Sequence, residues 1–189
     1  MLKIALLQQK DREYEASINT IKGIFAKYPS TVLEKGILQD SYKGFFQQEL
    51  EKQNYITILT YYERDKDILQ ASDDPDIFLA VGEAYRVLGL HNSASSIFQT
   101  ADKFFLEESR SPGLLFGLGD TSYRTGDLKN AYKLLMDLVQ KYPGYKDVPF
   151  AYYRIGQILL KEQKYNEAKR YLEIALSGHH QELSKADII

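Results

Sequence analysis

The feature that most constrains this chain is a pattern that recurs three times at a constant interval. The three copies begin at Pro75, Pro112 and Pro149, so both intervals are 37 residues (112−75 and 149−112). A glycine and an alanine recur inside the copies at the same interval: Gly82, Gly119 and Gly156, and Ala94, Ala131 and Ala168. Three independent classes of position that share one period indicate a repeat protein.

Each copy has the pattern of two helices joined by a short turn. Asp74 precedes Pro75 and Ser111 precedes Pro112, which places a capping residue before a proline in the first helical turn. Helices of about 12 to 15 residues are marginal in water alone, so they must be stabilised by packing against neighbours. We therefore predict an all-α fold, an α-solenoid of antiparallel helix pairs with about four to five units.

The N-terminal part follows the pattern less closely. The stretch Asp11–Ser17 resembles the later turn Gly126–Ala131, so Ser17 takes the alanine place there. Further along, Ile58 takes the alanine place within a helix predicted from Ile56 to Gln70. The helix before it is predicted to be lengthened or bent, because the segment is longer than one repeat helix needs.

We expect one continuous solenoid over residues 1–189, built from successive units of this kind. Its parts are a partial unit 1–29, a degenerate unit 30–70, clear units 75–108, 112–143 and 149–182, and the start of a further helix at 184–189. The chain begins and ends inside predicted helices, which favours a fragment of a longer chain. The alternative is a native start at a frayed helix.

The pattern resembles the tetratricopeptide repeat family, strongly over residues 75–176 and more weakly over 1–70. The first clear unit carries the family's signature residue types at Phe78, Val81, Gly82, Tyr85, Gly89, Ala94, Phe98 and Ala101. Departures from the signature are Ser122 at an aromatic place, Gln163 at the turn glycine and Leu138 at a small residue. The long link with Tyr142-Pro143 is similar to links in bacterial cell-envelope repeat proteins.

The resemblance implies a right-handed superhelix whose first helices line a concave groove that binds a partner peptide or helix. Carrying over the groove positions gives Leu79, Glu83, Arg86, Phe116, Asp120, Tyr123, Arg124, Tyr153, Gln157, Leu160 and Lys161. Family members that hold a terminal carboxylate use a clamp of basic and amide side chains, whereas Glu83 and Asp120 stand at those places here.

Acids at the clamp positions would repel a carboxylate, so an apolar or basic segment is the expected ligand, anchored on Phe116 and Tyr153. The alternative is that these aromatic side chains pack between adjacent units and the acids are solvated.

Composition excludes several classes of function. The chain has no cysteine, which excludes disulfides, thiolate metal sites and a cysteine nucleophile. Its net charge of −2 lacks the basic footprint of a general nucleic-acid binder. No stretch approaches the ~20 apolar residues of a membrane span, and none has the pattern of a signal peptide. The compartment stays open between cytoplasm and periplasm.

No group of residues has the pattern of a catalytic, cofactor or metal site. The adjacent pair His179-His180 diverges on a helix and has no third ligand type beside it, so we expect a solvated surface there. We therefore predict a non-enzymatic scaffold that binds a protein partner in the concave groove. The alternative is a structural or oligomerisation module that stacks or dimerises within a larger assembly.

Overall fold

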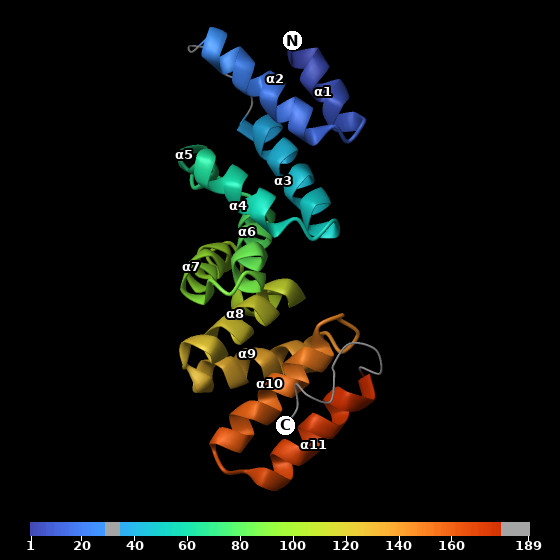
Figure 1. The fold of residues 1–189 in the computed structure, drawn as a ribbon, viewed down its shortest axis with the longest axis vertical. Coiled ribbons are helices and arrows are strands. Elements are labelled where there is room, and N and C mark those ends of the chain that lie inside the picture. The colour runs from blue at the N-terminus through green and yellow to red at the C-terminus, as the bar shows by residue number, and fades with distance from the viewer. Residues whose placement is uncertain (29–34, 179–189) are drawn as a thin grey trace. The chain divides into compact units, whose positions relative to one another are not determined.

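The fold was taken from a computed structural model, which describes residues 1–28 and 35–178 of the chain. The described residues form α-helices and one short 3₁₀ helix, without a strand (Figure 1). The α-helices are Leu2–Lys10 (α1), Tyr14–Lys27 (α2), Lys35–Glu51 (α3), Tyr55–Arg64 (α4), Lys66–Leu69 (α5), Pro75–Val87 (α6), His91–Asp102 (α7), Pro112–Thr125 (α8), Leu128–Lys141 (α9), Val148–Lys161 (α10) and Tyr165–Gly178 (α11). The predicted helix at 184–189 and His179-His180 lie outside the described residues.

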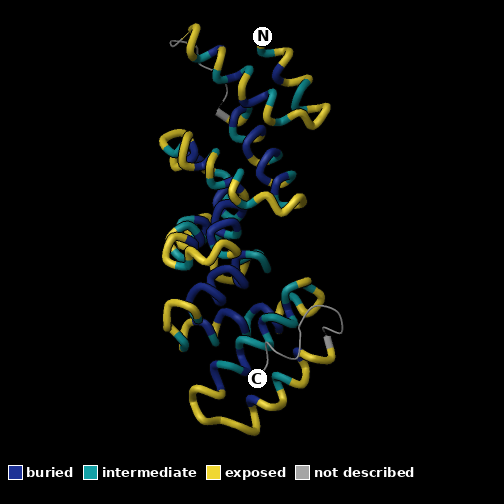
Figure 2. Tube along the Cα trace, in the orientation of Figure 1, coloured by how far each residue is buried: buried dark blue, intermediate teal, exposed yellow. Residues whose placement is uncertain are grey.

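The chain divides into two compact units, which we describe one at a time. The first unit, Met1–Gly89, contains α1 to α6, and the second unit, Leu90–Ile189, contains α7 to α11. In both units, buried and exposed positions alternate along the helices, as expected when each helix turns one face to its neighbours (Figure 2). The expectation of one continuous solenoid stays a prediction.

In the second unit, each helix packs on the next, and α8 also contacts α10. A Cβ atom on Gly119 would lie 2.7 Å from Cδ2 of Leu135, and one on Gly156 would lie 2.7 Å from Cδ2 of Leu172. Glycine therefore lets a leucine of the partner helix sit directly against the backbone of α8 or α10. The prediction that the repeated glycine marks a close helix crossing is confirmed for both pairs.

The predicted helix starts are also confirmed. The Asp74 carboxylate accepts a hydrogen bond from the backbone N–H of Asp76 at 2.9 Å, and Pro75 follows in the first turn. The Ser111 hydroxyl accepts one from the N–H of Leu114 at 3.3 Å. These side chains satisfy backbone donors that have no partner within the helix.

The first unit departs from the repeat in two places. Phe46 stands twelve residues before Ile58, as Gly119 stands before Ala131 (58−46 = 131−119 = 12), and both Phe46 and Ile58 are fully buried. Accordingly, the backbones of α3 and α4 come close to each other at fewer places than those of α8 and α9 do. The single helix predicted from Ile56 to Gln70 is wrong, because the chain leaves the helix at Asp65, between α4 and α5.

Candidate functional site

The predicted groove residues fall in both units. Leu79, Glu83 and Arg86 lie on α6 in the first unit. The other eight lie on α8 and α10 in the second unit: Phe116, Asp120, Tyr123, Arg124, Tyr153, Gln157, Leu160 and Lys161. Each group is therefore considered within its own unit.

On α6, the two charged candidates neutralise each other. Nε of Arg86 lies 2.8 Å from Oε2 of Glu83, and Nη2 lies 2.7 Å from Oε1, which is a two-point ion pair within one helical turn. Such planar pairing is the strong form of a guanidinium–carboxylate contact. Glu83 therefore does not stand as a lone carboxylate, and Leu79 beside it is half-buried.

In the second unit, Asp120 is buried and joins two first helices of adjacent repeats. Its Oδ1 accepts a hydrogen bond from Nε of Arg154 on α10 at 2.7 Å, and its Oδ2 lies 3.3 Å from Nε of Arg124 on α8. A buried carboxylate needs such partners to offset its loss of hydration. This geometry removes the reason for expecting Asp120 to repel a carboxylate ligand.

Two cations of α10, Arg154 and Lys161, lie close to aromatic rings. The guanidinium carbon of Arg154 lies 4.9 Å from the ring centre of Tyr123 and 5.6 Å from that of Tyr153. Nζ of Lys161 lies 4.6 Å from the ring centre of Tyr123. These distances fall within the range of cation–π attraction. We call Tyr123, Arg124, Tyr153, Arg154 and Lys161 the cation–aromatic cluster.

Gln157 fixes the orientation of the cluster. Its side-chain oxygen accepts a hydrogen bond from Nη1 of Arg154 at 2.7 Å, and its amide nitrogen donates to the hydroxyl of Tyr153 at 2.9 Å. With Asp120 on one side and Gln157 on the other, the guanidinium of Arg154 is held in one plane. Preorganised groups of this kind bind a ligand with less loss of conformational entropy.

The remaining candidates divide between core and surface. Phe116 is buried within the second unit, so it is not available as a ligand anchor in this structure. Leu160 is exposed next to Lys161 and offers an apolar contact instead.

Arg154 was missed by sequence reasoning, although it stands three residues before Gln157, the counterpart of Asp120 one period later (157−120 = 37). The available signal was a cation one helical turn before the position that corresponds to an acid in the preceding repeat.

A second charged cluster lies in the first unit around Asp65. Its carboxylate is paired with Lys22 of α2, accepts hydrogen bonds from Arg64 at 2.7 and 2.9 Å, and accepts one from the Tyr42 hydroxyl at 2.5 Å. Burial acts to raise the pKa of Asp65, but the hydrogen bonds from Arg64, Lys22 and Tyr42 outweigh it and leave the pKa below its ordinary value. Because the carboxylate is buried, this cluster joins helices and offers little surface to a ligand.

The described residues contain no group of three or more histidine, aspartate or glutamate side chains placed to hold a metal ion. Within the same residues, no helix has the length and apolar content that crossing a bilayer requires.

Two stretches of the second unit match a known family. The Tetratricopeptide repeat model matches residues 114–145 and residues 151–177. A search of the curated proteins finds no match.

Solved structures with the same fold extend over almost the whole chain. YrrB, described as a TPR protein with an unusual peptide-binding site, is 17% identical with a TM-score of 0.65, over 96% of this chain and 86% of YrrB. MamA is 16% identical with a TM-score of 0.59, over 94% of this chain and 95% of MamA. PilF of Pseudomonas aeruginosa is 17% identical with a TM-score of 0.56, over 95% of this chain and 75% of PilF. The likeness confirms the all-α solenoid class predicted from the helix pairs.

Proposed function

Because this chain belongs to the tetratricopeptide repeat family, we propose that it is a non-enzymatic protein-interaction scaffold whose second unit binds a partner peptide at the cation–aromatic cluster. The observation that carries the proposal is the fixed stack of Arg154 and Lys161 on Tyr123, at the face shared by α8 and α10. Aromatic and arginine side chains of this kind are the usual anchors of protein interfaces.

The charge of this face sets the ligand chemistry. Arg124, Arg154 and Lys161 supply three positive charges, and Asp120 supplies one negative charge that Arg154 already neutralises. The surplus of two positive charges (3−1) favours a segment with acidic side chains and disfavours a basic one. We retain the expectation that the ligand segment also carries apolar side chains, because Leu160 and the tyrosine rings offer apolar contact beside the charges.

The likeness to YrrB supports peptide binding as the kind of activity, since YrrB is described as having a peptide-binding site. A fold alone does not carry a function from one protein to another. The residues named above are therefore what the proposal rests on.

A selection from a random peptide library tests the proposal directly. Peptides captured by the intact chain should be rich in aspartate or glutamate next to an aromatic or leucine residue. A fluorescein-labelled peptide made to the selected sequence should bind at least about tenfold more weakly to Lys161→Glu, because one favourable charge becomes a repulsive one. Binding should also weaken as salt is added.

The matched control is Lys146→Glu, an exposed lysine of the same unit that lies outside the cluster. It changes the net charge by the same amount and should leave the affinity nearly unchanged. Selected peptides that are mainly basic, or equal losses in the two variants, would overturn the proposed site.

A further inference from the structure

The link between α7 and α8 exposes apolar side chains next to acids. Leu106 is 75% exposed, the highest fraction among the large hydrophobic residues that the structure describes, and Phe104 is 42% exposed. Glu107 and Glu108 follow directly and are also exposed. A single exposed leucine is ordinary on a protein surface. Together with the acids, however, it gives this segment both kinds of group that the peptide ligand proposed above carries. We call Phe104–Glu108 the apolar–acidic link.

The corresponding link one repeat later lacks this pattern. Residues 141–145 stand 37 positions after the apolar–acidic link (141−104 = 145−108 = 37), read Lys-Tyr-Pro-Gly-Tyr and contain no acid. Among them, the Tyr142 hydroxyl donates a hydrogen bond to the backbone carbonyl of Arg110 at 2.9 Å, so this later link packs back on the chain. The repeat architecture therefore does not require an exposed leucine or acids in a link.

Ion pairs hold the apolar–acidic link in place. Nε of Arg110 lies 2.6 Å from Oδ1 of Asp102, and Nη2 lies 2.7 Å from Oδ2, so the residues on either side of the link are tied together. Nζ of Lys133 on α9 lies 2.6 Å from Oε1 of Glu107. Glu108 and the apolar side chains stay exposed. A segment restricted in this way loses less conformational entropy when it binds.

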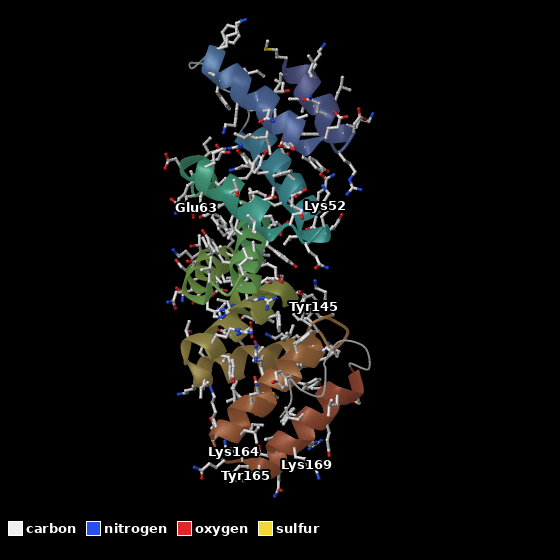
Figure 3. All side chains as sticks on the ribbon, in the orientation of Figure 1. Lys52, Glu63, Tyr145, Lys164, Tyr165 and Lys169 are labelled. Atoms are coloured by element: carbon white, nitrogen blue, oxygen red, sulfur yellow. The ribbon has the colours of Figure 1, made fainter. Side chains whose placement is uncertain are left out.

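The link lies away from the cation–aromatic cluster of its own copy. It directly precedes α8, whereas Tyr123 and Arg124 lie in the last turn of that helix, roughly 16 Å from its start. Figure 3 shows the same separation of links and turns at α10, where Tyr145 lies before one end of the helix and Lys164 lies after the other. A contact between link and cluster therefore needs a second copy of the chain.

We propose that this chain recognises itself, with the apolar–acidic link of one copy docked on the cation–aromatic cluster of another. The inference rests on the proposed function and names a partner for the same site. Glu107 and Glu108 bring acidic side chains to a face whose surplus charge is positive. Leu106 brings an apolar side chain to Leu160 and the tyrosine rings. Because the contact is no larger than a short peptide, its Kd is expected on the order of 100 μM.

A fluorescein-labelled peptide of residues 103–109 tests the recognition directly. It should bind the intact chain, compete with the peptide selected from the library, and bind Lys161→Glu at least about tenfold more weakly. If the selected peptide binds and the link peptide does not, self-recognition is wrong and the proposed function stands. If neither binds, the proposed function fails as well. A link peptide that binds Lys161→Glu as tightly as the wild type docks elsewhere, which also contradicts the proposal.

Light scattering tests the same contact between intact chains. The mass of the wild-type chain should grow with concentration up to about 1 mM. Leu106→Ser and Lys161→Glu should each weaken self-association at least about tenfold, because one removes the apolar side chain of the link and the other reverses a charge of the cluster. An equal mixture of the two variants should form dimers, since each variant keeps the surface that the other has lost.

Glu108→Lys and Glu167→Lys form a matched pair, because both reverse the charge of an exposed acid of the second unit and only Glu108 lies in the link. Glu108→Lys should weaken self-association, and Glu167→Lys should associate nearly as the wild type does. Circular dichroism should show all variants to be folded. A wild-type chain that stays monomeric at 1 mM, or equal losses in the matched pair, would overturn the proposal.

Discussion

The helix pairs α3–α4 and α8–α9 occupy the same place in the repeat but are packed in different ways. In α8–α9, Gly119 leaves room for Leu135 to rest on the backbone of α8. In α3–α4, the bulky pair Phe46 and Ile58 stands at the equivalent places, and the two backbones come close to each other at fewer places. A repeat can therefore close either by bringing backbones together or by placing a large side chain between them.

The first unit compensates for its looser crossing with buried polar contacts. The Ser17 hydroxyl donates to the carbonyl of Ala5 at 3.0 Å and lies 3.0 Å from the Ser41 hydroxyl, which joins α1, α2 and α3. Asp65 joins α2, α3 and the end of α4 in the same manner. Buried polar contacts depend on direction as well as distance, so they specify one arrangement of helices where apolar packing is less exact.

The largest effect in this comparison is expected from Phe46→Ala in the first unit. Phe46 is fully buried, so its removal leaves a cavity in the core of the first unit, and the unfolding free energy should fall by about 3 to 5 kcal/mol. Urea denaturation measures the change. Tyr28→Ala, at a half-exposed aromatic residue of the same unit, should cost about 0.5 kcal/mol or less. Equal effects at the two positions would mean that Phe46 is not the spacer between these helices.

The next effect concerns the polar cluster and depends on pH. Asp65→Asn should lower the unfolding free energy by about 2 kcal/mol at neutral pH. This loss is smaller than that expected on breaking a fully buried ion pair, because the side chains of Lys22 and Arg64 are partly exposed. The folded state lowers the pKa of Asp65, so its contribution is present above the ordinary carboxyl pKa of about 3.9 and is lost as pH falls through the lower folded value.

The difference between wild type and Asp65→Asn should therefore narrow below about pH 4. Denaturation curves of both proteins at a series of pH values measure it. A difference that stayed constant down to strongly acid pH would mean that the charge of Asp65 is not what stabilises the unit.

The comparison also shows which features of the fold and of the site could be predicted from the sequence. The 37-residue period predicted the helix pairs, the caps at Asp74 and Ser111, and the close crossing at Gly119, because each depends on local geometry that one residue type satisfies best. The break at Asp65 was not predicted, because Lys22 and the Tyr42 hydroxyl, which hold it together with the adjacent Arg64, come from α2 and α3. The ion pair between Asp120 and Arg154 was missed for the same reason, since it forms between repeats.

Substitutions in the turns between paired helices are expected to change stability least. They allow two opposite changes to be compared, glycine into one turn and out of another. The residue in the turn between the two helices has a positive φ in all five described repeats: Arg12, Gln53, Gly89, Gly126 and Gln163. For a residue with a Cβ atom this conformation costs roughly 1 to 2 kcal/mol, whereas glycine adopts it freely but loses more conformational entropy on folding. The net advantage of glycine at such a turn is therefore about 0.5 to 1 kcal/mol.

Gln163→Gly should accordingly stabilise the second unit by about 0.5 kcal/mol, and Gly126→Gln should destabilise it by about 1 kcal/mol. The loss is expected to exceed the gain, because φ is 94° at Gly126 and 61° at Gln163, and side chains are tolerated best near 60°. Thermal unfolding of both variants measures the two changes. Gly144→Gln is the control, since it lies in a link where a Cβ meets nothing within 4 Å and φ is not positive. If Gln163→Gly destabilised the unit, the glutamine would have to be held by a contact that outweighs its backbone strain.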